Sequence, residues 1–197
     1  MPRGSYLLSD HQGPFARERF ACAPGPLGGR YAATREDPTT GAPLGGLDVV
    51  LDPRGRVLRL QVTGAGWELR GGAVGEDQVL WKRGAVERQA AAAGFSGTSP
   101  VFALAAIRRL RPDSRGVTAR LAMIGDAALS VLLVDHRWTA TAPGPGGAAS
   151  YEVADLSTGV RGAVLIERDV VLAAPGAVLL EVIDTTAARL GPQDWQL

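Results

Sequence analysis

Short runs in which apolar and polar residues alternate dominate the chain and predict β-strands. Leu58, Leu60 and Val62, for example, share one face of an extended segment, whereas the polar residues between them share the other. Such runs recur at spacings of about 8 to 12 residues and are separated by turns rich in Gly and Pro. We therefore predict a mainly β fold with one large curved antiparallel sheet, a barrel or half-barrel of about ten strands.

One apolar stretch does not alternate and instead has helical spacing. Ser99 suits the N-cap, Pro100 suits the first helical position, and the apolar residues that follow recur every three or four positions. This pattern predicts one central helix near 99–110 that lies across the curved sheet; a strand over 101–110 is the alternative. The segment 84–93 is open between helix and strand, because its alanines favour a helix and its position favours a strand. A short helix is expected from Thr185 onward.

Length and charge place the chain among single globular domains. It has 197 residues, which we assign to one half-barrel domain spanning 1–197. The net charge is +1, from 21 Lys and Arg against 20 Asp and Glu, and these charges are spread along the chain. Nucleic-acid binding normally needs a clustered basic excess, so we do not expect it.

Other features of the composition bear on the compartment and the source. Cys22 is the single cysteine, so an intrachain disulfide cannot form. The N-terminus lacks the pattern of a signal peptide, and no window of about 18 apolar residues predicts a membrane span. We expect a cytoplasmic protein. Arg outnumbers Lys, whose single copy is Lys82, and this bias is typical of a high-GC bacterium such as an actinomycete.

The segment 131–140, VLLVDHRWTA, carries the strongest candidate for chemistry. Alternation places His136 and Trp138 on one face of this strand, where they follow the aliphatic residues Leu132 and Val134. If that face lines a cavity, His136 is a candidate general acid or base and Trp138 a wall for a ligand. The alternative is structural, with a histidine near solvent at the strand end and a tryptophan that covers the sheet.

Further candidates for ligand binding come from the helix and from the strands. Arg108 and Arg109 end the predicted helix and could clamp an anionic head group, although cations there also complement the helix dipole. Trp67 and Trp81 lie in adjoining hairpin arms, where they suit either a ligand platform or the sheet core. Tyr151 begins a later strand and completes the substrate-binding set.

The sequence does not point to a metal or a cofactor. Two histidines far apart and one cysteine do not have the spacing of metal ligands. The glycine pairs lack the lysine and the helix of a phosphate-binding loop and read as turns. We therefore expect neither a metal nor a cofactor.

The order of several segments resembles the bacterial glycolipid-binding family. The segments are GGLDVVLDPRGRVLRLQV, GWELRGGAVGEDQVLW, TSPVFALAAIRRLRP and YEVADLSTGV, and the similarity covers roughly Leu44 to Val171. It rests on strand order and on the short string Ile107 to Leu110. The residues before that string are plain aliphatic and do not match the family's fuller motif. The resemblance implies a half-barrel related to lipoprotein carriers, with a hydrophobic groove for an amphipathic molecule.

Together these features give two leading hypotheses of function. In the first, the protein binds a hydrophobic or amphipathic small molecule, lipid-like or polyketide-like, between the sheet and the helix. In the second, it is a cofactor-independent cyclase, isomerase or hydrolase of natural product biosynthesis, with His136 as the proton-transfer group. A homodimer and an interaction module that uses a free sheet edge stay open.

Overall fold

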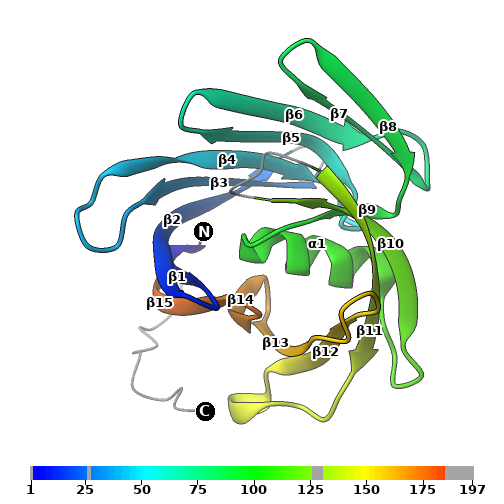
Figure 1. The fold of residues 1–197 in the computed structure, drawn as a ribbon. Coiled ribbons are helices and arrows are strands. Elements are labelled where there is room, and N and C mark those ends of the chain that lie inside the picture. Colours follow the sequence, from blue (N-terminus) through cyan, green and yellow to red (C-terminus); the bar gives the residue numbers. More distant parts are fainter. Residues whose placement is uncertain (1, 26–27, 126–130, 185–197) are drawn as a thin grey trace.

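A computed structural model describes residues 2–25, 28–125 and 131–184 of the chain (Figure 1). These residues form one sheet of fifteen strands that curls around one α-helix. The predicted mainly β half-barrel with a central helix is confirmed, but the described strands number fifteen rather than about ten. The segment from Thr185 onward, for which a short helix was predicted, lies outside the described residues.

The elements have the following bounds. The first eight strands are β1 (Pro2–Asp10), β2 (Gly13–Gly25), β3 (Gly28–Glu36), β4 (Pro43–Leu51), β5 (Val57–Gly64), β6 (Trp67–Ala73), β7 (Gln78–Arg83) and β8 (Val86–Ala91). They are followed by β9 (Gly94–Ser96), the helix α1 (Pro100–Leu110), β10 (Val117–Ile124) and β11 (Val131–Ala140). A 3-10 turn η1 (Pro145–Gly147) precedes β12 (Ala149–Asp155), β13 (Arg161–Glu167), β14 (Val170–Ala174) and β15 (Ala177–Asp184).

The sheet is a meander in which most strands pair with their neighbours along the chain. Its order is β8-β7-β6-β5-β4-β3-β2-β1-β15-β14-β13-β12-β11-β10-β9, so the first and last strands pair and β8 and β9 form the two edges. All of these pairings are antiparallel except that of β9 with β10, which is parallel. The exception has a simple cause, because α1 connects these two strands and returns the chain to the same end of the sheet.

Two of the additional strands come from segments whose sequence signal is weak. Val86–Ala91, in the segment left open between helix and strand, pairs with β7 along its whole length as β8. The three residues of β9 pair with Leu121, Ala122 and Met123 of β10. Both segments are short and lack a clear alternation of apolar and polar residues. Their pairing partners, not their own composition, therefore make them strands.

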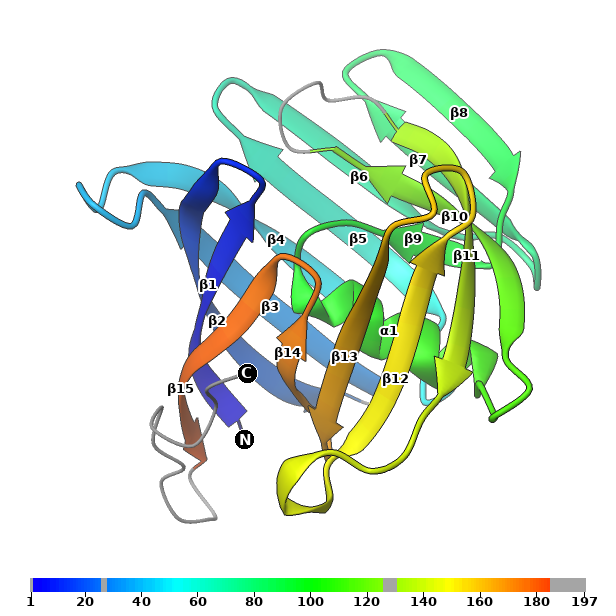
Figure 2. The same ribbon diagram turned by 60° about the horizontal axis from the view of Figure 1, so that its bottom comes forward.

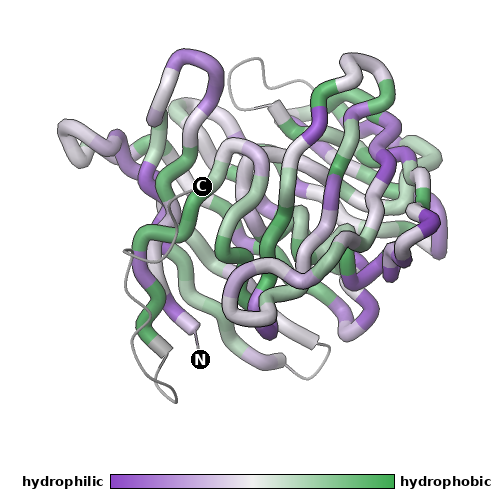
Figure 3. Tube along the Cα trace, turned by 90° about the horizontal axis from the view of Figure 1, so that it is seen from below, coloured by the Kyte–Doolittle hydropathy of each residue, from purple (hydrophilic) through white to green (hydrophobic). Residues whose placement is uncertain are grey.

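Alternation along the strands separates a packed concave face from a polar convex face. In β4, Leu47, Val49 and Leu51 are buried and belong to the same apolar core as residues of α1. Asp48 points to the other face, where its carboxylate accepts hydrogen bonds from the guanidinium group of Arg30. Figure 3 shows that hydrophilic stretches include the tips of hairpins at the rim of the sheet.

The helix α1 lies inside the curve of the sheet, where it fills the concave side (Figure 2). Its buried residues include Val101, Leu104 and Ile107, which have the helical spacing expected from the sequence, and also Phe102. Arg111 caps the C-terminal end of the helix: its φ of 47° is left-handed, and its N–H donates to the carbonyl of Ile107 at 2.9 Å. In the described part of the chain, no helix has the length and apolar character that crossing a membrane would need.

Candidate functional site

A cleft of about 450 Å³, which we call the helix cleft, lies beside the first turns of α1. Its other walls come from β9 and from the concave faces of β10, β11, β12 and β13. Most of its lining is apolar and includes Phe102, Met123, Ile124, Trp138, Val153 and Val164. A cleft of this size between a helix and a curved sheet is large enough for a small organic molecule.

His136 and Trp138 lie on the wall of the helix cleft, two residues apart on β11. Their ring centroids are 6.5 Å apart and their planes are tilted by 51°. Trp138 is 4% exposed and His136 is half-buried. Within the described residues, Nε1 of Trp138 and Nδ1 of His136 are both buried and have no hydrogen-bond partner. Buried polar atoms are usually satisfied, so two such atoms on one wall point to a missing partner.

The electrostatic surroundings keep the His136 imidazole neutral at neutral pH. Burial lowers its pKa, and the nearby carboxylates of Asp155 and Asp135 only partly oppose this effect. Asp155 lies directly opposite His136 in the register of β11 and β12. Hydrogen bonds from the Ser157 hydroxyl and from the backbone N–H groups of Ser157 and Thr158 lower the pKa of Asp155. The cleft therefore holds a neutral base beside a fixed negative charge.

A buried polar cluster, which sequence analysis missed, adjoins the helix cleft at the N-terminus of α1. Glu18 is fully buried and its Oε1 accepts hydrogen bonds from the Tyr31 hydroxyl at 2.7 Å and from the Ser99 hydroxyl at 2.6 Å. Its Oε2 accepts a bond from Nε of Arg35 at 2.9 Å. Arg35 also donates to the hydroxyl of Thr98, which lines the cleft with Ser99. A signal did exist, because alternation places Glu18 on the same face as Ala16 and Phe20.

Ser99 occupies the predicted N-cap position but does not cap the helix with its side chain. Its backbone is extended, and Pro100 follows at the start of the helix, as predicted. The hydroxyl bonds Glu18 instead of a backbone N–H group of the first turn. Burial and the Glu18 carboxylate raise the pKa of Tyr31 well above its usual value, so the phenol stays protonated as a donor.

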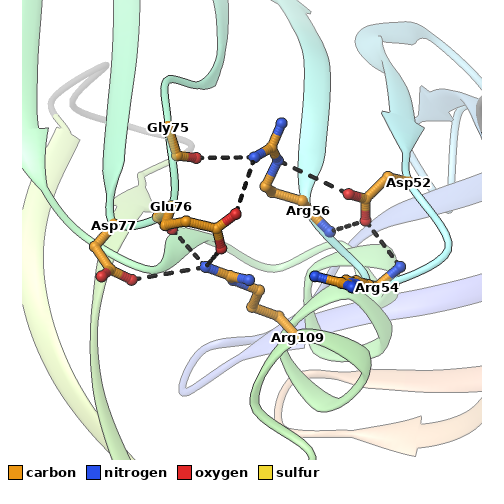
Figure 4. A network of polar contacts seen from close by, with 7 residues as sticks. All are labelled: Asp52, Arg54, Arg56, Gly75, Glu76, Asp77 and Arg109. Carbon is orange, nitrogen blue, oxygen red and sulfur yellow. Dashed lines mark hydrogen bonds and ion pairs between the residues drawn. The ribbon is translucent and has the colours of Figure 1, made fainter.

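The two arginines at the end of α1 lie outside the helix cleft. Arg109 donates to the backbone carbonyl and the carboxylate of Glu76 and lies 3.6 Å from Asp77 (Figure 4). It thereby ties α1 to the turn between β6 and β7, where Arg56 also bonds the carbonyl of Gly75 at 3.0 Å. Arg108 pairs with Asp169, in the turn between β13 and β14. The two guanidinium groups diverge and do not form a joint clamp.

A second cleft of about 480 Å³ flanks the other side of α1. Arg108 lines this cleft with Val101 and Leu104, which share its helix face, and with Cys22 of β2. Burial raises the pKa of the Cys22 thiol to about 11. The thiol is therefore protonated at neutral pH and is a poor nucleophile.

The remaining predicted residues divide between the core and a third hollow. Tyr151 packs against the apolar cluster that contains Trp138. Trp67 and Trp81 line a hollow of about 810 Å³ formed by β6, β7 and β8, which we call the hairpin hollow. The structure therefore brings His136, Trp138 and Tyr151 into one region and separates them from the other two tryptophans and from both arginines.

Within the residues that the structure describes, no three His, Cys, Asp or Glu side chains gather in a way that could hold a metal ion. The chain matches no family model, and no curated protein matches it. Its fold is similar to the crystal structure of a DUF1089 family protein from Pseudomonas aeruginosa, with a TM-score of 0.58. The match covers 81% of this chain and 89% of that chain at 19% sequence identity. At this identity the likeness shows the fold alone.

Proposed function

We propose that the protein binds an amphipathic small molecule in the helix cleft. The observation that carries this proposal is the pair of buried, unpartnered ring nitrogens of His136 and Trp138 on the wall of an otherwise apolar cleft of about 450 Å³. An unsatisfied buried polar atom costs about 1–3 kcal/mol, and a bound polar group would relieve that cost. The resemblance to a glycolipid-binding family supports the same class of ligand.

The charges around the cleft favour a ligand whose polar end is neutral. Trp138 can only donate through its indole N–H, and neutral His136 can donate or accept. Asp155 and Arg161 both line the cleft, but the Arg161 guanidinium group is paired with the Glu152 carboxylate at 2.8 Å. The ionised carboxylate of Asp155 forms no such ion pair among the described residues and would repel an anionic head group. Hydroxyl groups suit Trp138, His136 and Asp155, because a hydroxyl both donates and accepts. We therefore propose an alkyl chain or similar apolar body that ends in a hydroxyl-bearing group, such as a sugar.

The residues proposed here to bind the polar end of the ligand differ from those that the sequence suggested. The sequence pointed to Arg108 and Arg109, whereas both are engaged with carboxylates outside the helix cleft. His136 and Trp138 take that role here. The cytoplasmic location, the homodimer and the actinomycete source stay predictions.

The proposal is tested with octyl glucoside below its micelle concentration as a neutral probe and octanoate as an anionic one. We expect calorimetry to detect octyl glucoside binding and little or no octanoate binding. Ala103 lines the cleft on α1, so Ala103→Trp should fill the space and abolish binding. Ala42→Trp is the matched control: Ala42 is exposed between β3 and β4 and does not line the cleft, so this variant should bind as the wild type does. Equal binding by both variants, or none by the wild type, would refute the proposal.

An enzyme is the second candidate, and the neutral state of His136 favours it. A neutral imidazole with an unpartnered nitrogen in an apolar cleft can accept a proton from a bound molecule. Native mass spectrometry of the purified protein would identify a co-purified ligand, and its mass over time would report conversion. If the protein is an enzyme, His136→Gln should keep the ligand bound and stop the conversion. A ligand that stays unchanged on the wild-type protein would rule this candidate out.

A further inference from the structure

The hairpin hollow, far from the helix cleft in strand order, combines two indole rings with several cations. Trp81 and Arg88 lie directly opposite each other in the register of β7 and β8, so their side chains share a face of the sheet. Arg83 lies two residues after Trp81 on β7, so it is on that same face. Trp67 shares the face too, because it lies two residues before Leu69, which pairs with Arg83. This face packs against the core near Val79 but reaches the free edge of the sheet at β8.

Glycines give both indole rings room against the sheet. At Gly64, which pairs with Trp67 across β5 and β6, a Cβ atom would lie 2.1 Å from Nε1 of the indole. At Gly71, which pairs with Trp81, a Cβ atom would lie 3.3 Å from the Cβ of Trp81. Each tryptophan therefore lies opposite a glycine, where a larger residue would crowd the ring of Trp67 or the Cβ of Trp81.

The charge of the hollow is positive and is only partly balanced within the protein. Its lining includes the carboxylate of Glu68 and four cations, Arg70, Lys82, Arg83 and Arg88. In the register of β6, β7 and β8, Arg83 and Arg88 share the face of the two indole rings, whereas Arg70 and Lys82 lie on the opposite face. Glu68 is already paired with Arg70 at 2.8 Å. Lys82 lies directly opposite Glu87 across β7 and β8. Arg88 is the exposed cation of the indole face, and among the described residues it forms no ion pair. By contrast, Arg30 and Arg59 on the same sheet share the carboxylate of Asp48.

We propose that the hairpin hollow is a second binding site, which takes a small oxyanion that carries an aromatic ring. Indole faces stack on planar rings, and cations near them pair with a carboxylate or phosphate group. A mononucleotide and an aromatic acid share this chemistry. The site is independent of the helix cleft, because the two share neither a lining residue nor a preferred charge.

The experiment uses the full chain with AMP and salicylate as ring-bearing anions, adenosine as a ring without the anion, and inorganic phosphate as an anion without the ring. Binding is followed through the indole N–H resonances of a ¹⁵N-labelled sample, which Trp67→Phe and Trp81→Phe variants assign. We expect AMP, salicylate or both to shift the resonances of Trp67 and Trp81 and to leave that of Trp138 in place. Adenosine and phosphate should bind at least tenfold more weakly.

Charge variants then test which cations hold the anion. The double variant Arg83→Gln with Arg88→Gln removes the two cations that share the face of the indole rings and should weaken binding about tenfold or more. Arg3→Gln makes the same kind of change at an exposed position on β1 and should bind within about twofold of the wild type. The inference is wrong if neither ring-bearing anion moves the two resonances, if phosphate binds as tightly as AMP, or if the double variant binds as the wild type does.

Discussion

Ser99 and Glu18 lie 81 positions apart in the sequence, and the hydroxyl of Ser99 donates to the carboxylate of Glu18 at 2.6 Å. The bond joins the first residue before α1 to the middle of β2, across the interior of the curved sheet. Tyr31 and Arg35 of β3 hold the same carboxylate. The helix is thus anchored at its N-terminal end, where the helix cleft lies, by a buried charge with three partners.

We predict that Glu18→Ala lowers the free energy of unfolding by about 3–5 kcal/mol. The substitution leaves the guanidinium group of Arg35, whose side chain is 11% exposed, without the carboxylate that it pairs with at 2.9 Å. Urea denaturation followed by circular dichroism measures the change. Ser99→Ala removes only one hydrogen bond to this charge and should cost about 1.5–3 kcal/mol.

Glu36→Ala is the control for the buried pair. Glu36 lies on β3, next to Arg35, and pairs with Arg19 of β2 at 2.8 Å, but the Arg19 side chain is 60% exposed. A surface pair of this kind contributes about 0–1 kcal/mol. Equal losses from Glu18→Ala and Glu36→Ala would show that the Glu18 cluster does not anchor the helix.

Local sequence patterns were enough to predict most of the fold. Alternation with two-residue period located strands such as β5 and β11, and Ser99 with Pro100 located the start of α1. The pattern failed for β9, which is three residues long and is a strand only because it pairs with β10. The pattern did not decide between helix and strand for β8, because its alanines are common in helices. Pairing with β7 makes this segment a strand.

The candidate site was predictable only where it is local. His136 and Trp138 share a strand, so their common face followed from their spacing. Glu18 escaped notice because its partners are 13, 17 and 81 residues away. Arg108 and Arg109 look like a pair in the sequence, but adjacent residues on a helix point about 100° apart. Each therefore meets a different acidic turn, which the sequence alone could not place.

Cys22 should react slowly with thiol reagents in the folded protein. Burial raises its pKa from 9.0 to about 11, so the thiolate fraction near neutral pH falls about a hundredfold relative to an unperturbed thiol. The rate with an alkylating reagent should rise with pH up to about 11, and the protein in urea should react at the rate of an ordinary cysteine. A folded protein that reacts as fast as the unfolded chain at pH 8 would contradict this assignment.

Gly71→Ala should destabilise the protein by about 1–3 kcal/mol, because the added methyl group overpacks the seam between the sheet edges. A Cβ at this position would lie 2.8 Å from the carbonyl oxygen of Leu80 and 3.1 Å from the ring of Phe95 on β9. Gly29→Ala is the control, since its nearest neighbour would be 4.0 Å away. Thermal unfolding of both variants measures the difference, and equal midpoints would mean that β9 does not pack tightly on β6.

The stability that His136 contributes should decrease as the pH falls below neutrality. Its pKa in the folded protein lies below the ordinary value of 6.5, with burial as the main cause. Between these two values the unfolded chain binds more protons than the folded protein, so acid favours unfolding in that window. Above about pH 7 the imidazole is neutral in both states and the contribution is fully present.

Comparison of the wild type with His136→Gln isolates this effect, because glutamine does not titrate. We expect the stability of the wild type relative to the variant to be constant above about pH 7 and to decrease toward pH 5. An NMR titration in a His11→Gln background, which leaves one histidine, gives the folded-state pKa directly. A value at or above 6.5 would mean that the imidazole is not desolvated, and the helix cleft would then lack the neutral group on which its proposed ligand preference depends.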